Sequence, residues 1–385
     1  MYIKIFRINE FAIYMKKYKY IIKCLIFAFY PAVYTPANIN IELNHDSTIT
    51  FTYKDSLAHR VIIKGDGMLF HKKSVNGHQR MYNKSKGVWE YTTTMPIAPD
   101  LYTYQLFVDG VLIDSVDSNY LYLRNKKKNF FLIENNQSML YKCGANERGT
   151  IKHIEFLDCD SNAFIGNIYL PYQYQDTMRY PVLFLFHGIN GNHFDWIEQG
   201  RIANILDNLI QNRKIQPIIV VTPRCFLTKS KNNYVRSCIF NYNKILTRQF
   251  EKHFFKWENY IDAHYSITHE NNAIAGLSCG ARQAANIRNT NTNRYKYIGL
   301  LSPVLTKQQL PMRSIDTLKL WIGVGADDWV AYGNTQRYIE NLNKMNIGYT
   351  YLETEGGHCF MNWRKYITYF LLWAFPIINN KEVAK

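Results

Sequence analysis

The C-terminal part of the chain alternates short, continuous apolar runs with longer segments in which apolar and polar residues recur at helical spacing. A continuous apolar run bounded by polar residues is typical of a strand buried on both faces of a parallel sheet. We predict such strands near 181–186, 217–222, 272–277, 297–301, 318–324 and 349–353, and helices over 201–213, 245–263, 281–289, 334–345 and 362–374. This alternation predicts an α/β fold with a doubly wound, mostly parallel sheet and helices on both faces.

Residues 39 to about 134 follow a different pattern, in which short runs alternate apolar and polar residues with period two. The predicted strands are Thr48–Tyr53, Arg60–Lys64, Val88–Thr93, Leu101–Val108 and Asn129–Ile133. Turn signals separate them, among them the hairpin pair Asp109-Gly110. Strands at this spacing predict a small all-β sandwich. Its aromatic and apolar residues at period-two positions should face the core or the neighbouring domain, namely Trp89, Tyr91, Tyr102, Tyr104 and Leu106.

The N-terminal residues predict a secretory signal peptide. A basic stretch at Met15–Lys19 precedes the apolar run Cys24–Val33, and Thr35-Pro-Ala37 offers small residues for cleavage. The start is Met1 or Met15. The run is too short for a membrane span, so we expect a secreted or periplasmic protein without one after cleavage. The predicted organisation is leader 1–37, sandwich 38–134, linker 135–149, catalytic domain 150–376 and polar tail 377–385.

The charge and the cysteine content limit the classes of binding partner and of cross-link that we expect. The formal charge is +16, of which the first 37 residues carry +5 and the rest +11, with one cluster at Arg124–Lys128. No nucleic-acid motif accompanies this dispersed charge, so we expect a solvated basic surface and no nucleic-acid partner. The cysteines form no C-x-x-C pair. Pairing of Cys225 with Cys238 or of Cys143 with Cys159 and free thiols both stay open.

The strongest chemical signal is a Gly-x-Ser-x-Gly motif at Gly276–Gly280, between a predicted strand and a predicted helix. In this context the chain turns sharply through the serine, so that its hydroxyl stands clear of the sheet edge. We therefore predict Ser278 as a nucleophile. A metal hydrolase is not favoured, because His269-Glu270 begins an H-E-x-x-H pattern that ends on Ala273. We expect neither a metal nor a cofactor.

A serine nucleophile needs a base and an orienting acid. His358, after Gly356-Gly357, is the one histidine downstream of Ser278 and is the predicted base. The acid is Asp328 or Asp327, after the apolar run 318–325, and turn geometry favours Asp328. Weaker alternatives are Glu353 and Glu355.

The oxyanion of an acyl-transfer reaction should be held by two backbone N–H groups. One predicted donor is Cys279, directly after the nucleophile. The other is Ile189, in the loop His187–Gly191 that follows the apolar strand 180–186. We expect His187 itself to be structural.

With these residues assembled, the region 150–375 resembles the esterase D/feruloyl esterase group of α/β-hydrolases, which includes the family-one carbohydrate esterases. The resemblance rests on Val182–Gly191, Trp196, Gln216–Pro223, Ala273–Ser278, Gly323–Asp328, Gly356–His358 and Trp363. It implies Ser278, His358 and Asp328 as the catalytic triad. The group usually has Ser-Met-Gly-Gly at the nucleophile, where this chain has Ser278-Cys-Gly-Ala281. Arg224-Cys225 likewise replaces an acidic-Gly pair.

The sandwich resembles the early-set, immunoglobulin-like domains related to glycogen-binding modules. The matching stretches are Gly87–Trp89, Pro99–Tyr104 and Val108–Gly110. Sugar binding by this domain and a packing role against the hydrolase are both open, and the core-type positions of its aromatics favour packing.

These resemblances imply a secreted serine esterase that acts through an acyl-enzyme on feruloyl or acetyl esters of plant polysaccharide such as xylan. An ester-decorated polysaccharide or oligosaccharide is the expected partner, and the expected substrate contacts are Trp196, Trp329 and Trp363. Two alternatives stay open. One is an acyltransferase or a siderophore esterase of the enterochelin type with the same fold, and the other is a catalytically silent carbohydrate-binding protein.

Overall fold

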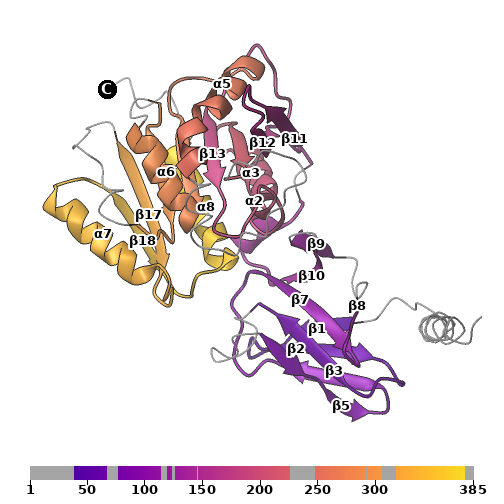
Figure 1. Cartoon of the computed structure of the whole chain (residues 1–385). Coiled ribbons are helices and arrows are strands. Elements are labelled where there is room, and N and C mark those ends of the chain that lie inside the picture. Colours follow the sequence, from indigo (N-terminus) through magenta and orange to yellow (C-terminus); the bar gives the residue numbers. More distant parts are fainter. Residues whose placement is uncertain are drawn as a thin grey trace, which may run out of the picture.

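The computed structural model describes residues 39–66, 77–113, 119–123, 126–144, 146–225, 248–290, 294–305 and 318–377. The expected leader 1–37 and Cys238 lie outside these ranges. The described chain forms two bodies, an α/β domain and an all-β sandwich, which meet along one side of each (Figure 1). The expected fold class, an α/β-hydrolase sheet preceded by a small β domain, is confirmed.

The α/β domain is built on one eight-stranded sheet with the order β11-β12-β14-β13-β15-β16-β17-β18. All neighbours from β14 to β18 are parallel, whereas β11 and β12 are antiparallel to their neighbours. The strands are β11 (Thr150–Leu157), β12 (Ala163–Leu170), β13 (Val182–Phe186), β14 (Ile219–Pro223), β15 (Ala273–Leu277), β16 (Tyr297–Leu301), β17 (Lys319–Gly325) and β18 (Thr350–Thr354).

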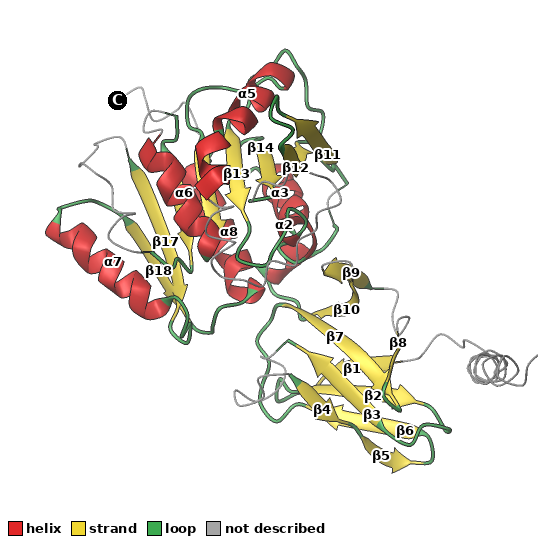
Figure 2. Ribbon diagram, in the orientation of Figure 1, coloured by secondary structure: helices red, strands yellow, loops and turns green. Residues whose placement is uncertain are grey.

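Each face of this sheet carries its own core, because successive side chains of a strand point to opposite faces. In β13, Phe184 and Phe186 pack with helices α5, α6 and α7, whereas Leu183 and Leu185 pack with α2, α3 and α8. Figure 2 shows the two groups of helices on opposite sides of the strands. The helices are α2 (Asp195–Glu198), α3 (Ile202–Gln211), α5 (Phe255–His264), α6 (Cys279–Thr290), α7 (Tyr332–Lys344) and α8 (Phe360–Ala374).

The sandwich has two sheets with the orders β1-β2-β6-β5 and β4-β3-β7-β10-β9, and β8 pairs with β7. All five residues expected to face inward, from Trp89 to Leu106, lie in its hydrophobic core. The strands are β1 (Ile39–Leu43), β2 (Ile49–Lys54), β3 (Val61–Gly65), β4 (His78–Arg80), β5 (Tyr82–Ser85), β6 (Val88–Thr92), β7 (Leu101–Val108), β8 (Val111–Ile113), β9 (Tyr120–Leu123) and β10 (Lys126–Leu132). A short 3₁₀ helix, η2 (Ser138–Tyr141), lies between the sandwich and β11.

The two bodies are joined through Arg364 of α8, which is buried. Its guanidinium donates to Asp100 Oδ1 at 2.6 and 3.1 Å, to the carbonyl of Leu101 at 2.7 Å and to that of Gln199 at 2.8 Å. Met361, one turn earlier in α8, packs into the sandwich core and accepts a hydrogen bond from the Tyr102 hydroxyl. The start of α8 is therefore held by both bodies.

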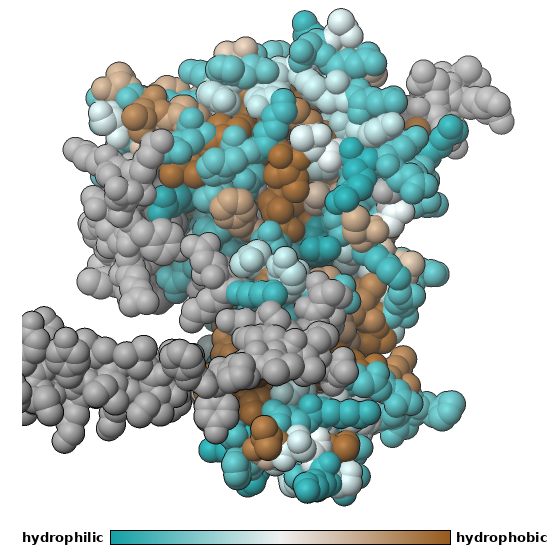
Figure 3. Space-filling view, turned by 90° about the vertical axis from the view of Figure 1, so that its right-hand side faces the viewer, coloured by the Kyte–Doolittle hydropathy of each residue, from teal (hydrophilic) through white to brown (hydrophobic). Residues whose placement is uncertain are grey.

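The surface in Figure 3 is mainly hydrophilic, and hydrophobic residues gather on it in separate patches. Among the described residues, no helix is both long and apolar enough to cross a membrane. Cys143 and Cys159 are free and exposed, so the structure does not pair them, and Cys225 is a free, buried thiol.

Candidate active site

The predicted nucleophile sits at the turn between β15 and α6. Ser278 has a left-handed φ of 54°, and its N–H donates to the Leu301 carbonyl at 2.9 Å. The flanking glycines are required by the closeness of the backbone. A Cβ on Gly276 would lie 2.5 Å from the carbonyl carbon of Gly280, and a Cβ on Gly280 would lie 2.5 Å from the His187 oxygen. The strand, helix and preceding loop therefore leave room only for glycine here.

The two aspartates that the sequence left open occupy different environments. Asp328 is fully buried, and its Oδ1 accepts the N–H groups of Ala331 and Val330 at 2.9 and 3.2 Å. Its carboxylate is bonded to His358 Nδ1, at 2.8 Å through Oδ2 and 3.0 Å through Oδ1. Asp327 is exposed, and Glu353 accepts the Tyr351 hydroxyl. Of the four acids considered, Asp328 is the one bonded to His358.

The electrostatics of this pair favour an ionised carboxylate. Burial raises the pKa of Asp328, but the hydrogen bond and charge of His358 and the N–H of Ala331 outweigh burial, so the net pKa is lowered. Since the carboxylate occupies Nδ1 of His358, the proton on that nitrogen is fixed and Nε2 is the ring nitrogen available to the cavity.

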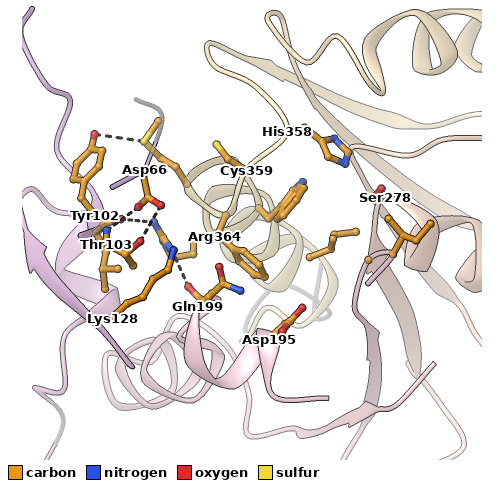
Figure 4. A pocket seen from close by; sticks show the side chains of 17 residues that line it. Asp66, Tyr102, Thr103, Lys128, Asp195, Gln199, Ser278, His358, Cys359 and Arg364 are labelled. Atoms are coloured by element: carbon orange, nitrogen blue, oxygen red, sulfur yellow. Dashed lines mark hydrogen bonds between the residues drawn. The ribbon is translucent and has the colours of Figure 1, made fainter. Parts of the chain in front are cut away.

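His358 and Ser278 line the same cavity (Figure 4). Within the described residues they share no direct hydrogen bond, as is common before substrate tightens an active site. The His358 ring packs edge-on against Trp363, with ring centroids 5.0 Å apart. This contact limits the orientations open to the imidazole.

The loop after β13 brings Gly188 and Ile189 to the cavity wall beside Ser278. The loop is closed by a hydrogen bond from the Gly191 N–H to the Gly188 carbonyl. His187 is buried. Its Nδ1 bonds the Gly188 carbonyl at 2.8 Å, and its Nε2 accepts the Cys225 N–H at 3.0 Å. Both ring nitrogens therefore hold the backbone, which fits a structural role.

The cavity has a volume of about 570 Å³ and is lined by both bodies. The α/β domain supplies an apolar part around Ser278, which includes Ile189, Leu277, Phe360 and Trp363. The sandwich supplies Asp66, Leu101, Tyr102, Thr103 and Lys128. Sequence reasoning missed the sandwich contribution, because nothing in a β-strand pattern signals which residues will face a different domain.

The three tryptophans predicted to contact substrate lie in three different environments in the structure. Trp363 lines the cavity, is 8% exposed, and its indole N–H has no hydrogen-bond partner among the described residues. Trp196 is 1% exposed, and its indole N–H donates to the Phe186 carbonyl at 3.0 Å. Trp329 is 90% exposed and does not line the cavity. Trp196 therefore packs in the core and the Trp329 side chain lies in solvent, so Trp363 is the one of the three that the structure places at the cavity.

The comparisons with known proteins agree with this architecture. The family model described as putative esterase matches residues 162–373, which is more than half of the chain. The chain belongs to this esterase family. Over 72% of its length, this chain is 29% identical to an endo-1,4-beta-xylanase/feruloyl esterase from Xylanibacter ruminicola. The match spans 39% of that relative's length. A shorter match, 40% identical over 58 residues, is to an endo-1,4-beta-xylanase Y from Acetivibrio thermocellus and spans 5% of that protein.

Solved structures show the same fold. A CE1 ferulic acid esterase from Anaeromyces mucronatus matches 62% of this esterase and 95% of its own chain, with a TM-score of 0.54 and 21% identity. The enterobactin esterase of Shigella flexneri matches 88% of this esterase and 96% of its own chain, with a TM-score of 0.62 and 12% identity. The second likeness therefore extends beyond residues 162–373.

Proposed function

We propose that the chain is a serine carboxylic-ester hydrolase that works through an acyl-enzyme. The observation that carries the proposal is the bond between His358 Nδ1 and the buried carboxylate of Asp328, on the same cavity as a serine with a left-handed backbone. A nucleophile, a base and a group that orients the base are the parts that acyl transfer needs. Family membership among the esterases supports the same reaction class.

In the proposed reaction, Ser278 Oγ attacks the ester carbonyl carbon while His358 Nε2 takes the hydroxyl proton. The oxyanion of the tetrahedral intermediate accepts hydrogen bonds from the backbone N–H groups of Ile189 and Cys279. As the C–O bond to the alcohol breaks, His358 passes its proton to the departing oxygen. Water then attacks the acyl-Ser278 ester by the same route in reverse, which releases the acid and restores the serine. Asp328 stabilises the imidazolium formed in each step.

For the substrate we propose feruloyl or acetyl esters on plant polysaccharide such as xylan. The name of the Xylanibacter relative couples xylanase with feruloyl esterase, which supports this class. The apolar wall around Ser278, which includes Trp363, suits a flat aromatic acyl group. A secreted protein is the matching proposal for location, since xylan is outside the cell.

A second candidate is an esterase of the siderophore type. It is favoured by the likeness to the Shigella enterobactin esterase, which covers 88% of this chain, whereas the ferulic acid esterase covers 62%. The catalytic residues proposed above serve both candidates equally, so the two differ only in the substrate that fits the cavity.

One side-by-side assay tests these proposals. The purified protein is incubated with methyl ferulate, acetylated xylan and a cyclic catecholate triester, and product acids are measured, with the Ser278→Ala variant as the blank. Turnover of methyl ferulate or acetylated xylan supports the first candidate, and turnover of the triester alone supports the second. If no ester is hydrolysed faster by the wild type than by Ser278→Ala, the esterase proposal is wrong and the silent carbohydrate-binding alternative replaces it.

A further inference from the structure

The cavity is polar at one end and apolar at the other, and the polar end belongs to the sandwich. In Figure 4, Ser278 and His358 lie on one side of the cavity and Asp66, Tyr102, Thr103 and Lys128 on the opposite side. An ester has two parts, an acyl group and an alcohol, on either side of the carbonyl that Ser278 attacks. A cavity with two chemically different ends is suited to sorting these parts.

Asp66 is held in place before any ligand arrives. Its Oδ2 accepts the Thr103 N–H at 2.7 Å and its Oδ1 accepts the Thr103 hydroxyl at 2.9 Å. The Asp66 N–H in turn donates to the Thr103 carbonyl at 3.1 Å. A carboxylate has about four acceptor positions. Thr103 occupies two of them, so Asp66 retains capacity to accept hydrogen bonds from a molecule in the cavity.

Three charged residues line this end of the cavity, namely Arg364, Lys128 and Asp66. Arg364 faces the cavity, but its guanidinium is matched by Asp100 and by two backbone carbonyls. Lys128, from β10, adds an ammonium group, which is a hydrogen-bond donor only. Asp66 is an acceptor only when ionised. The sandwich wall therefore carries a fixed acceptor, Asp66, and an ammonium group with three donor hydrogens, Lys128.

We propose that this sandwich wall, Asp66 with Lys128, binds the sugar part of the ester while the acyl part lies against the apolar wall near Ser278. Vicinal hydroxyl groups both donate and accept, so they match a wall that carries one acceptor and one donor. The inference rests on the proposed esterase function and names the alcohol that this site prefers. It makes Asp66 a specificity-determining residue although it belongs to the other domain.

The test compares a sugar ester with an ester of the same acid that has no sugar, namely feruloyl-arabinose and methyl ferulate. The variants are Asp66→Asn and Lys128→Met. An asparagine keeps the shape of Asp66 and retains both Thr103 contacts, because the hydroxyl of Thr103 can rotate to accept. The matched control is Asp55→Asn. Asp55 accepts the N–H groups of Leu57 and Ala58 in a sandwich turn and does not line the cavity.

We expect Asp66→Asn to lower kcat/KM for feruloyl-arabinose by about tenfold, as for the loss of one charge-assisted hydrogen bond, and to change kcat/KM for methyl ferulate by less than about twofold. Lys128→Met should act in the same direction, and Asp55→Asn should leave both substrates unchanged. Equal losses on both esters, or no loss on either, overturn the inference while leaving the esterase function standing.

A binding measurement separates this inference from the proposed reaction. Titration of feruloyl-arabinose into Ser278→Ala and into Ser278→Ala with Asp66→Asn reports affinity without turnover. We expect the double variant to bind about tenfold more weakly. If the wild type hydrolyses no ester and this difference persists, the reaction is wrong and the sugar site stands. If the two affinities are equal, the sugar site is wrong whatever the enzyme hydrolyses.

Discussion

The α/β domain and the sandwich supply residues to one cavity in different ways. The α/β domain presents Ser278, Asp328, His358 and Ile189 from loops that follow parallel strands, so all four come to the same edge of the sheet. The sandwich presents Thr103 and Lys128 from strands β7 and β10, and Asp66 from the residue directly after β3. The candidate catalytic residues thus come from loops placed by a parallel sheet, whereas the opposite wall comes from strands of an antiparallel sheet.

The largest effect is expected at the nucleophile. Ser278→Ala should lower kcat on a responsive ester on the order of 10⁵-fold, because the attacking oxygen is lost while the fold is kept. Initial rates and far-UV circular dichroism measure this. Ser161→Ala is a matched control, since Ser161 also has a left-handed φ of 60° but is exposed and outside the cavity. Retention of more than about a tenth of wild-type kcat in Ser278→Ala rules out the assignment.

A somewhat smaller effect is expected at the acid. Asp328→Asn should lower kcat on the order of 10³-fold, because an amide favours the wrong tautomer of His358 and cannot stabilise its charged form. Asp327→Asn is the control, since the Asp327 side chain is exposed, whereas Asp328 is buried and bonded to His358. Steady-state kinetics of the two variants measure the losses in kcat. A larger loss for Asp327→Asn would mean that Asp327, and not Asp328, orients His358.

Removal of the sandwich measures how much its contacts stabilise the α/β domain. Deletion of residues 38–134 should destabilise the α/β domain by about 1.5–3 kcal/mol, because Arg364 loses its charge-assisted hydrogen bonds to Asp100 and to the Leu101 carbonyl. Met361 also loses the apolar core into which it packs. Melting curves of the full-length and the truncated protein should show a lower Tm for the truncated one. A truncated protein that melts at the wild-type temperature contradicts this prediction.

The smallest effect concerns pH. The folded pKa of Asp328 is lowered, so its contribution to stability is fully present above the ordinary value of 3.8 and is lost as pH falls through the folded pKa. The wild type should therefore lose more stability than Asp328→Asn between about pH 5 and pH 3. Urea unfolding of both proteins at the two pH values measures the difference. Identical losses mean that the His358 contact does not stabilise the folded carboxylate.

Local patterns predicted well which side chains lie at the carboxyl edge of the parallel sheet. The six predicted parallel strands and the turns after them are set by short, continuous apolar runs, so the sequence alone places Ser278, Asp328 and His358 at one edge of the sheet. The missed strands lack a continuous apolar run or a clean alternation. In β12 most residues are buried, but Gly166 and Asn167 interrupt its apolar sequence. In β11 only Ile154 is buried, and every residue of β5 is exposed, so neither carries an apolar pattern.

The remaining differences come from contacts between residues far apart in the sequence. Trp196 looks like a cavity residue in the sequence, but its indole N–H is used by the Phe186 carbonyl inside the core. Asp66 looks like a turn residue, and its place in the cavity depends on how α8 docks on the sandwich through Arg364 and Met361. No local pattern encodes such docking.

The left-handed backbone of Ser278 makes stability and activity conflict at this one position. A residue with a side chain costs on the order of 1 kcal/mol there, whereas glycine adopts the same φ freely. Ser278→Gly should therefore produce a protein that is inactive yet unfolds at a higher temperature than the wild type. Selection for folded yield alone would favour that glycine, so serine is expected at this position only where turnover is also under selection.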